Sequence, residues 1–307
     1  MEKLAQFAIT PELPSALDRY LQRLNDVPCV MVVDELIREL GVFYDRAARS
    51  GALDQFRDAC QSHPLHKIAL EDPFTERAFT KPRGYAGDAV MLDYIYRPGM
   101  MTLSEVGSAV NFVTTGVSAA KSIIWRRDHL GIEIAKTVGR IRDARILSVA
   151  SGHLRELDVV RTMVEQRDFE IVALDQDGES LQEAVNSNPE FNVRPVNKSI
   201  SHLFKGQDGT SYDLIYSAGL FDYLPAKTAS GLLDRLLAML RPSGRLIVGN
   251  YAPENYARGY MEGMMGWSLL YRSEADLEAL LQSRVEYRAF RDDPGNVVYL
   301  EVSSDRN

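Results

Sequence analysis

Residues 144–178 read ARILSVASGHLRELDVVRTMVEQRDFEIVALDQDG and hold the pattern that decides the fold class. A short apolar run (144–150) precedes a stretch with helical spacing (151–166), and a second apolar run follows it (169–175). Strands that alternate with helices in this way are typical of a parallel sheet with helices on both faces. The segment therefore predicts an α/β fold.

The same alternation continues from this segment to the end of the chain. The remaining elements are expected, in chain order, as a helix at 177–188, strands at 191–197 and 211–219, a helix at 229–240, a strand at 245–251, a helix at 274–282, and strands at 285–292 and 296–305. The last two strands are joined by the turn sequence Asp-Pro-Gly-Asn and form a hairpin. The prediction is a mostly parallel, doubly wound sheet with a C-terminal antiparallel hairpin.

The N-terminal part of the chain has a different pattern. Residues 13–70 and 104–141 carry apolar residues three and four positions apart, as amphipathic helices do. Residues 71–101 are dense in proline, glycine and aromatic residues, which indicates a structured loop with a short helix. We therefore expect a helical N-terminal extension, or lid, at residues 1–125 and a Rossmann-like domain at residues 126–307.

Composition limits the class of protein and its partners. The 307 residues are 45% hydrophobic and 25% charged, with a net charge of −8, which is ordinary for a globular chain. The negative charge and the absence of a basic stripe disfavour nucleic acid and an anionic membrane as partners, and leave a small molecule. The sequence does not indicate an oligomeric state.

Cysteine usage and the N-terminus indicate a cytoplasmic location. Two isolated cysteines, Cys29 and Cys60, make neither a disulfide framework nor a metal cluster. The first residues, MEKLAQFAITPELP, lack the basic and apolar regions of a signal peptide, and the apolar runs are too short to span a membrane. His63 and His66 have a spacing that could chelate, but no third ligand is evident, so no metal is expected.

The turns after the first two strands suggest a nucleoside site, because ligands of such sheets bind outside the carboxyl ends of the strands. Small residues at Ser151 and Gly152 let the backbone turn tightly, and the following helix offers N–H groups to an anion. Asp175 lies 23 residues after Gly152, where an acid can accept both hydrogen bonds of a ribose diol. Each feature also has a structural alternative: an ordinary turn, and a helix N-cap.

The turns after the third and fourth strands extend this set. Asn197-Lys198-Ser199 can face an adenine edge or form a solvated loop, and YSAGLFDYL (216–224) places small residues before an aromatic and acidic pair. Asp222 is a candidate base, an orienting acceptor or a helix cap. Only Gly152 remains of a full glycine-rich loop, which suits S-adenosylmethionine better than a dinucleotide, because a sulfonium nucleoside has no pyrophosphate.

Residues 145–307 resemble the class I S-adenosylmethionine-dependent methyltransferase fold. The whole chain resembles a bacterial family with a helical N-terminal extension. The strings that carry this resemblance are KPRGYAGDAVMLDYIY (81–96), SVASGHLRE (148–156), YSAGLFDYL (216–224) and RGYMEGMMGWSLLYR (258–272). The family includes enzymes that form the methyl ester of 3-hydroxypalmitic acid, and it is similar to enzymes that convert S-adenosylmethionine into azetidine-2-carboxylic acid.

The resemblance implies roles for individual residues. For the cofactor these are Ser151, Gly152 and His153 at the methionine part, Asp175 and Gln176 at the ribose, Asn197, Lys198 and Ser199 at the adenine, Ser217 and Gly219 near the sulfonium, Arg83 at the methionine carboxylate, and Tyr85 closing over the cofactor. The candidate catalytic residues are Asp222, Tyr223 and Ser217, and the candidate substrate pocket is Tyr251, Arg258, Tyr260, Trp267 and Tyr271. The string around Arg83 has the alternative role of a rigid turn. A ring of Tyr223, Tyr251 or Trp267 could stabilise the sulfonium cation.

Three functions follow as expectations. The first is methyl transfer to a small-molecule acceptor, with a carboxylate among the candidates, in secondary metabolism. The second is cyclisation of S-adenosylmethionine to azetidine-2-carboxylic acid, with release of methylthioadenosine. The methyltransferase-like members are expected to carry an acidic residue directly before the tryptophan, but here Gly266 precedes Trp267. Without that acid a proton-abstracting role in methyl transfer is weakened. The third is a non-catalytic nucleoside-binding module.

Overall fold

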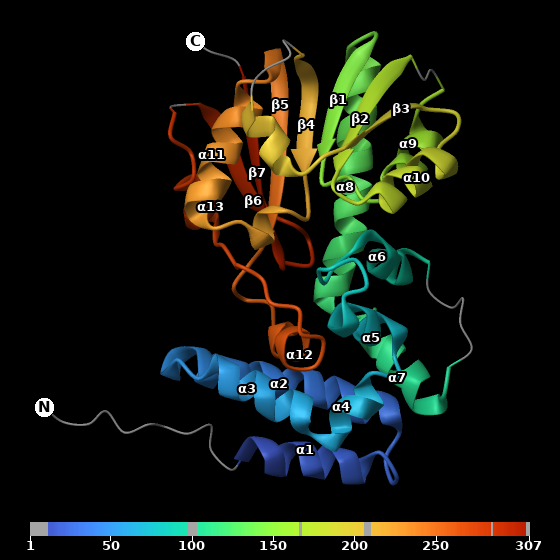
Figure 1. The fold of residues 1–307 in the computed structure, drawn as a ribbon, viewed down its shortest axis with the longest axis vertical. Coiled ribbons are helices and arrows are strands. Elements are labelled where there is room, and N and C mark those ends of the chain that lie inside the picture. Colours follow the sequence, from blue (N-terminus) through green and yellow to red (C-terminus); the bar gives the residue numbers. More distant parts are fainter. Residues whose placement is uncertain (1–11, 98–102, 166–167, 206–209, 284, 305–307) are drawn as a thin grey trace, which may run out of the picture. The chain divides into compact units, whose positions relative to one another are not determined.

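The computed structural model describes residues 12–97, 103–165, 168–205, 210–283 and 285–304. The expected element ends at residues 166 and 305, and the chain before Glu12, lie outside these ranges. Two compact units are present (Figure 1). The helical unit contains the described residues up to Lys121 together with Asn255–Ser268, and the sheet unit contains Ser122–Glu254 and the described residues from Leu269 onward.

The sheet unit is built on seven strands in the order β3-β2-β1-β4-β5-β7-β6 (Figure 1). Their bounds are β1 Ala144–Val149, β2 Phe169–Asp175, β3 Asn192–Asn197, β4 Tyr212–Ser217, β5 Leu240–Tyr251, β6 Glu286–Arg291 and β7 Val297–Ser303. The first five strands pair in parallel, and β7 pairs antiparallel with both β5 and β6. This confirms the predicted Rossmann-like sheet, mostly parallel with a C-terminal antiparallel hairpin, and its strand order reverses between β1 and β4.

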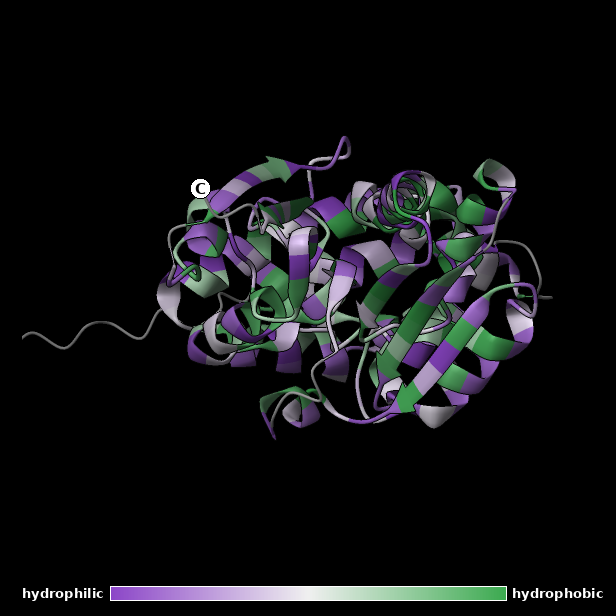
Figure 2. Ribbon diagram, turned by 90° about the horizontal axis from the view of Figure 1, so that it is seen from above, coloured by the Kyte–Doolittle hydropathy of each residue, from purple (hydrophilic) through white to green (hydrophobic). Residues whose placement is uncertain are grey.

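Helices cover both faces of the sheet. They are α8 Ser118–Arg140, α9 Leu157–Met163, α10 Gly178–Ser187, α11 Ala226–Leu237 and α13 Glu274–Glu278, with short 3₁₀ turns at η1 Ile200–Lys205 and η2 Phe221–Tyr223. Strand residues alternate between the faces. Leu246 and Val248 of β5 pack in one cluster with α11, whereas the ring of Tyr299 on β7 lies near Trp125 and His129 of α8. Figure 2 shows hydrophobic and hydrophilic residues alternating along both strands and helices.

The helical unit is formed by eight helices among its described residues. These are α1 Glu12–Arg23, α2 Cys29–Ser50, α3 Leu53–Ser62, α4 Pro64–Ala69, α5 Pro73–Thr80, α6 Ala89–Tyr96, α7 Glu105–Thr114 and α12 Arg258–Gly263. The apolar residues spaced three and four apart form its core, as Leu13 and Leu17 of α1 and Leu36 and Leu40 of α2 illustrate. The segment 71–101, expected as a loop with one short helix, holds both α5 and α6.

Residues 255–268 were expected in the Rossmann-like domain, but they pack within the helical unit. The backbones of α12 and α2 touch: a Cβ on Gly259 would lie 2.2 Å from the carbonyl oxygen of Leu40. Glu262 of α12 is buried, and it accepts hydrogen bonds from the Tyr44 hydroxyl at 2.8 Å and from Arg57. Small residues and a buried ion pair therefore attach this segment to helices more than 200 positions earlier.

The helix after β1 begins later than the sequence pattern indicates. It was expected from Ser151, but α9 begins at Leu157. Ala150, Gly152 and Leu154 have φ angles of 55°, 54° and 53°, so all three residues adopt the left-handed conformation. A right-handed helix cannot form across such residues. An irregular turn therefore separates the end of β1 from the N-terminus of α9.

No helix among the described residues is both long and apolar enough to cross a membrane.

Candidate functional site

The ends of β1 and β4 are joined where the strand order reverses. The Ser217 hydroxyl, fully buried at the end of β4, donates to the carbonyl of Val149 at 3.0 Å. The turn that follows β1 holds Ser151, whose buried hydroxyl has no hydrogen-bond partner among the described residues. An unpartnered buried hydroxyl costs about 1–3 kcal/mol. This turn can therefore accept a polar group from a ligand at low cost.

Asp175 at the end of β2 holds the post-β1 turn. Its Oδ2 accepts from the Gly152 N–H at 2.9 Å, and its Oδ1 accepts from the Asp177 N–H at 2.9 Å. Burial raises the pKa of this carboxyl above its usual range, and the backbone hydrogen bonds oppose the rise. The helix-cap alternative for Asp175 is wrong, because Asp177 is the N-cap of α10. Each carboxylate oxygen keeps acceptor capacity for a ligand hydroxyl.

The residues after β3 lie beside Asp175. The Asn197 amide donates to the carbonyls of Asp175 and Gln176 at 3.2 and 3.0 Å, and the Lys198 N–H donates to the carbonyl of Asp175 at 2.9 Å. Ser199 is exposed, and its hydroxyl lies 2.6 Å from that of Ser201. The ends of β2 and β3 therefore form one polar edge, with Gln176 and Lys198 exposed.

The turn after β4 contains Asp222 within η2. Its Oδ1 accepts from the Tyr251 N–H at 2.6 Å, so the carboxyl ties this turn to the end of β5. The helix-cap alternative is wrong here also, because α11 follows Pro225 without any side-chain cap. Burial raises the pKa of Asp222 to about 6, while the Tyr251 N–H, Arg126 and Arg272 oppose the rise. Asp222 is therefore a buried acid that is mostly ionised at neutral pH.

Arg126 supports the same turn from α8, and no sequence motif marks this residue. Its guanidinium is buried and donates to the carbonyl of Ala218 at 2.6 Å. A Cβ on Gly219 would lie 3.3 Å from the same guanidinium, which explains the small residue at this position. Arg126 also lowers the pKa values of Glu156, Asp222 and Tyr251 against the larger effect of burial. Helical spacing alone gives no sign of this role.

Four further candidates lie in the sheet unit, and two of them are buried. His153 is buried, with Nδ1 3.4 Å from the guanidinium of Arg155. The Tyr251 ring is buried, and burial raises the pKa of its hydroxyl far above the usual range. Tyr223 and Tyr271 are partly buried.

The structure brings ten of the proposed cofactor and catalytic residues to the carboxyl ends of β1–β4. They are Ser151, Gly152, His153, Asp175, Gln176, Asn197, Lys198, Ser217, Gly219 and Asp222.

Three candidates for the substrate pocket lie in the helical unit. The Tyr260 hydroxyl is buried 3.0 Å from the Thr75 hydroxyl, and Arg258 pairs with Asp45 at 2.5 Å. Trp267 is buried and its backbone N–H donates to Met261. These side chains therefore contribute to the packing of the helical unit.

Gly266, where an acid was expected, has a backbone reason to be glycine. Its φ angle is 58°, and a Cβ would lie 3.3 Å from the ring of Phe79. An acid would be strained and crowded at this position. The absence of an acid therefore reflects the local fold and does not discriminate between the candidate reactions.

Arg83 and Tyr85 lie in a turn that is closed at its base. Arg77 donates to both oxygens of Asp88 at 2.8 and 3.0 Å, and Asp88 caps α6 through the Met91 N–H. Arg83 and Tyr85 are each partly buried within this turn. The rigid-turn alternative therefore has direct support, and the cofactor roles of the two side chains stay predictions.

Metal ligation has little support among the described side chains. His63 caps α4 through its Nδ1 and contacts Asp18 at 3.1 Å, and His66 lies 2.9 Å from the Met264 carbonyl. Within the described ranges, no three His, Cys, Asp or Glu side chains are grouped to hold a metal ion. The two cysteines are free, and burial raises the pKa of the Cys60 thiol to about 12.

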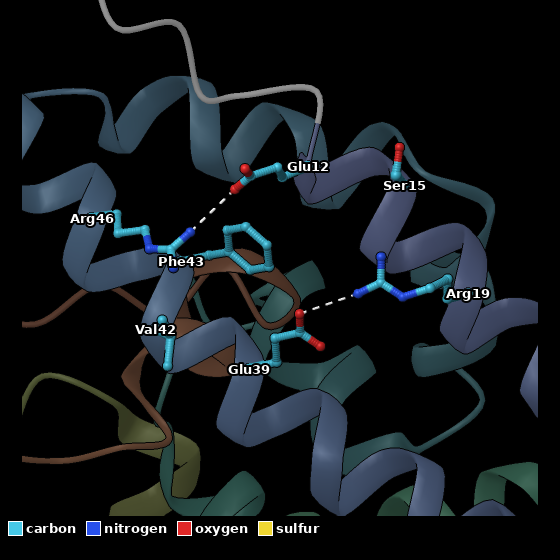
Figure 3. Close-up of a pocket in the computed structure, with 7 residues that line it drawn as sticks. All are labelled: Glu12, Ser15, Arg19, Glu39, Val42, Phe43 and Arg46. Atoms are coloured by element: carbon cyan, nitrogen blue, oxygen red, sulfur yellow. Dashed lines mark hydrogen bonds and ion pairs between the residues drawn. The ribbon is translucent and has the colours of Figure 1, made fainter.

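A separate surface groove of about 530 Å³ lies between α1 and α2 (Figure 3). Phe43 and Val42 form its apolar part, and the ion pairs Arg19–Glu39 and Arg46–Glu12, at 3.3 and 3.2 Å, border it (Figure 3). All four charged side chains are at least one-third exposed, so these pairs contribute little to stability.

Solved structures of low sequence identity share the arrangement of this chain to different extents. No protein-family model matches the chain, and no curated protein matches its sequence. A structure from Bordetella parapertussis, named as a possible exported protein, has a TM-score of 0.59 at 15% identity, and the match covers 99% of both chains. The N-methyltransferase NodS from Bradyrhizobium japonicum WM9, in complex with S-adenosyl-L-homocysteine, has a TM-score of 0.43 at 12% identity, covering 59% of this chain and 88% of NodS. Magnesium protoporphyrin IX methyltransferase from Synechocystis PCC 6803 with bound S-adenosylmethionine has a TM-score of 0.45 at 15% identity, covering 71% and 98%.

Proposed function

We propose that this chain is an S-adenosylmethionine-dependent enzyme that transfers a methyl group to a small-molecule acceptor in secondary metabolism, with carboxylates among the candidate acceptors. The observation that carries the proposal is the convergence of Ser151, Asp175 and Asp222 at the carboxyl ends of neighbouring parallel strands. Ligands of such sheets bind at this edge, where the strand order reverses. A cytoplasmic location and a small-molecule partner are part of the proposal.

The residues at this edge fit a sulfonium nucleoside. The Ser151 hydroxyl is buried and needs a polar partner, and the Asp175 carboxylate can accept from ribose hydroxyls while it holds Gly152. Asn197 would border the adenine. Asp222 brings a negative charge to the turn where the sulfonium is expected, and opposite charges attract strongly in a buried site.

Bound S-adenosylmethionine would supply an electrophilic methyl carbon. The protein's own task is to orient the acceptor and to exclude water, because a positioned acceptor reacts far faster than a free one. A carboxylate acceptor has no proton to lose, so no base is needed for it. Ser217 and Gly219 keep the turn after β4 compact, since the hydroxyl is bound to Val149 and the missing side chain leaves room for Arg126.

Cyclisation to azetidine-2-carboxylic acid is the second candidate, and Asp222 is the observation that favours it. The amine of the methionine part must be unprotonated before it can attack its own carbon chain. A buried carboxyl with a pKa of about 6 can accept that proton near neutral pH. The reaction would need no second substrate and would release methylthioadenosine.

Two measurements test the proposal. Titration calorimetry with S-adenosylmethionine should show binding to the wild type and a loss of at least about tenfold in affinity for Asp175→Ala, because the loop contact and the ribose contact are removed together. Asp168→Ala is the matched control, because Asp168 is exposed at the opposite end of β2 and should keep wild-type affinity. Absence of binding to the wild type would refute the proposed function.

Incubation with S-adenosylmethionine and no acceptor, followed by mass spectrometry, separates the candidate reactions. Methylthioadenosine with an equal amount of a four-carbon amino acid would assign cyclisation and overturn methyl transfer. Intact S-adenosylmethionine would support methyl transfer, to be followed by carboxylic acid acceptors and detection of S-adenosylhomocysteine. Binding without turnover on any acceptor would assign a nucleoside-binding module.

A further inference from the structure

Asp222 connects the two ends of a long excursion of the chain. The chain leaves the sheet unit after Glu254 and returns at Leu269. Tyr251 ends β5 just before this departure, and its N–H donates to Asp222 Oδ1 at 2.6 Å. Leu270 follows the return, and its N–H donates to the carbonyl of Asp222 at 2.7 Å. One residue of the post-β4 turn therefore holds both ends.

Arg272 also hydrogen-bonds to the turn that contains Asp222 and to the end of β5. Its Nη1 donates to the carbonyl of Phe221 at 2.7 Å, and its Nη2 donates to the carbonyl of Leu224 at 2.5 Å. These two carbonyls flank Asp222 in the sequence. The backbone N–H of Arg272 also donates to the carbonyl of Tyr251 at 2.9 Å. A planar guanidinium can reach both carbonyls at once, whereas a lysine ammonium is a single point charge on a flexible stem.

Asn250 completes this arrangement, which we call the arginine clamp: Arg272, Asn250 and the turn 221–224. Asn250 is fully buried, its Oδ1 accepts from Arg272 Nη1 at 2.7 Å, and its amide donates to the carbonyl of Leu270 at 2.8 Å. Buried polar groups are stable only when they are hydrogen-bonded. The clamp therefore has one preferred geometry.

Groups on three elements act on Asp222. The positive charges of Arg126 on α8 and of Arg272 in the returning segment act on its carboxylate, and the backbone N–H of Tyr251 on β5 donates to it. Three more groups act on these neighbours: Asp292 and Tyr223 on Tyr251, and Asp276 on Arg272. Both arginines favour the ionised carboxylate against the effect of burial.

We propose that Arg272 is a positioning residue, which fixes the orientation of Asp222 through the carbonyls on both sides of it. The positive charge of the same guanidinium favours the ionised carboxylate of Asp222. The proposal rests on the proposed function for the role of Asp222, but the clamp itself can be tested without a ligand. It gives a role to the last residue of the string RGYMEGMMGWSLLYR, whose glycines pack in the helical unit.

The test compares Arg272→Met, Arg272→Lys and the control Arg288→Met, all in the unliganded protein. Arg288 lies on β6 of the same sheet, and its side chain is 65% exposed. Carbon-13 NMR of protein labelled at its aspartate carboxyls measures the pKa of Asp222 from the change of its signal with pH. The Asp222→Asn variant, which lacks this signal, assigns it. We expect Arg272→Met to raise the pKa of Asp222 by about one pH unit, the lower end of the effect of a neighbouring opposite charge. Arg272→Lys should leave it within a few tenths of a unit.

Amide hydrogen exchange reports the geometry separately from the charge. Arg272→Lys should speed exchange at Tyr251 and Leu270 by about tenfold or more, because a lysine cannot hold both carbonyls. Arg288→Met should change neither readout. Unchanged exchange in Arg272→Lys, or an unchanged pKa of Asp222 in a folded Arg272→Met, would overturn the proposal. If Arg272→Met does not fold, the exchange result of Arg272→Lys decides.

Catalysis gives the third readout. If wild type binds S-adenosylmethionine, Arg272→Lys should lower kcat by about tenfold or more while the Kd for S-adenosylmethionine changes less than about threefold. A proportional loss of both would indicate a structural role and overturn the positioning role. If wild type does not bind S-adenosylmethionine, the proposed function fails, while NMR and exchange still test the clamp.

Discussion

Asp222→Asn should change how the stability of the sheet unit depends on pH. The asparagine oxygen can still accept from the Tyr251 N–H, so the variant removes the ionisation and keeps the hydrogen bond. The folded pKa of Asp222 is raised to about 6 from 3.8, so the folded protein binds this proton more tightly than the unfolded chain does. Its contribution to stability is complete below the unfolded pKa and is lost as pH rises through 6.

The size of the effect follows from the shift. A rise of about two pH units corresponds to about 3 kcal/mol, most of it lost between pH 4 and pH 7. Over that interval the unfolding free energy of the wild type should fall by about 2 kcal/mol more than that of Asp222→Asn. Asp276→Asn is the control with the opposite sign, because hydrogen bonds from Ser273 lower the pKa of Asp276.

The assay is urea unfolding at several pH values between 4 and 7. The chain has two tryptophans, and Trp125 is in the sheet unit while Trp267 is in the helical unit. Fluorescence of Trp125 in a Trp267→Phe background therefore follows the unit that contains Asp222. Parallel stability curves for wild type and Asp222→Asn in this background would refute a raised pKa for the buried carboxyl.

Three further changes test other contacts. Gly219→Ala places a Cβ 3.3 Å from the Arg126 guanidinium, so calorimetry should show weaker S-adenosylmethionine binding with little change in stability; unchanged affinity would exclude a role for this turn in binding. Gly259→Ala places a Cβ 2.2 Å from the Leu40 carbonyl oxygen and should lower the unfolding free energy by about 1–3 kcal/mol, as overpacking does. Gly139→Ala, with open space around it in α8, should instead be neutral or stabilising by up to about 1 kcal/mol; equal losses for both glycines would contradict the close approach of the two backbones.

The sequence by itself determined the fold class and the edge of the sheet that carries the candidate site. Each strand or helix must bury one side, so its apolar residues recur in the sequence with the period of that element. These local patterns predict the strands and helices. Asp175, Ser217 and Gly219 could be located for the same reason: Asp175 and Ser217 end such strands, and Gly219 follows two residues later. The alternation alone then brings the ends of β1, β2 and β4 together.

The tertiary structure alone decided which side chains are committed to packing and which charges converge. Arg126 and Arg272 are far from Asp222 in the sequence, and nothing in their local patterns indicates that they act on the same carboxyl. Likewise, the Tyr260 hydroxyl lies 3.0 Å from that of Thr75, a contact between segments 185 positions apart. Burial and long-range hydrogen bonds depend on the packing of distant segments, and local sequence patterns contain no record of that packing.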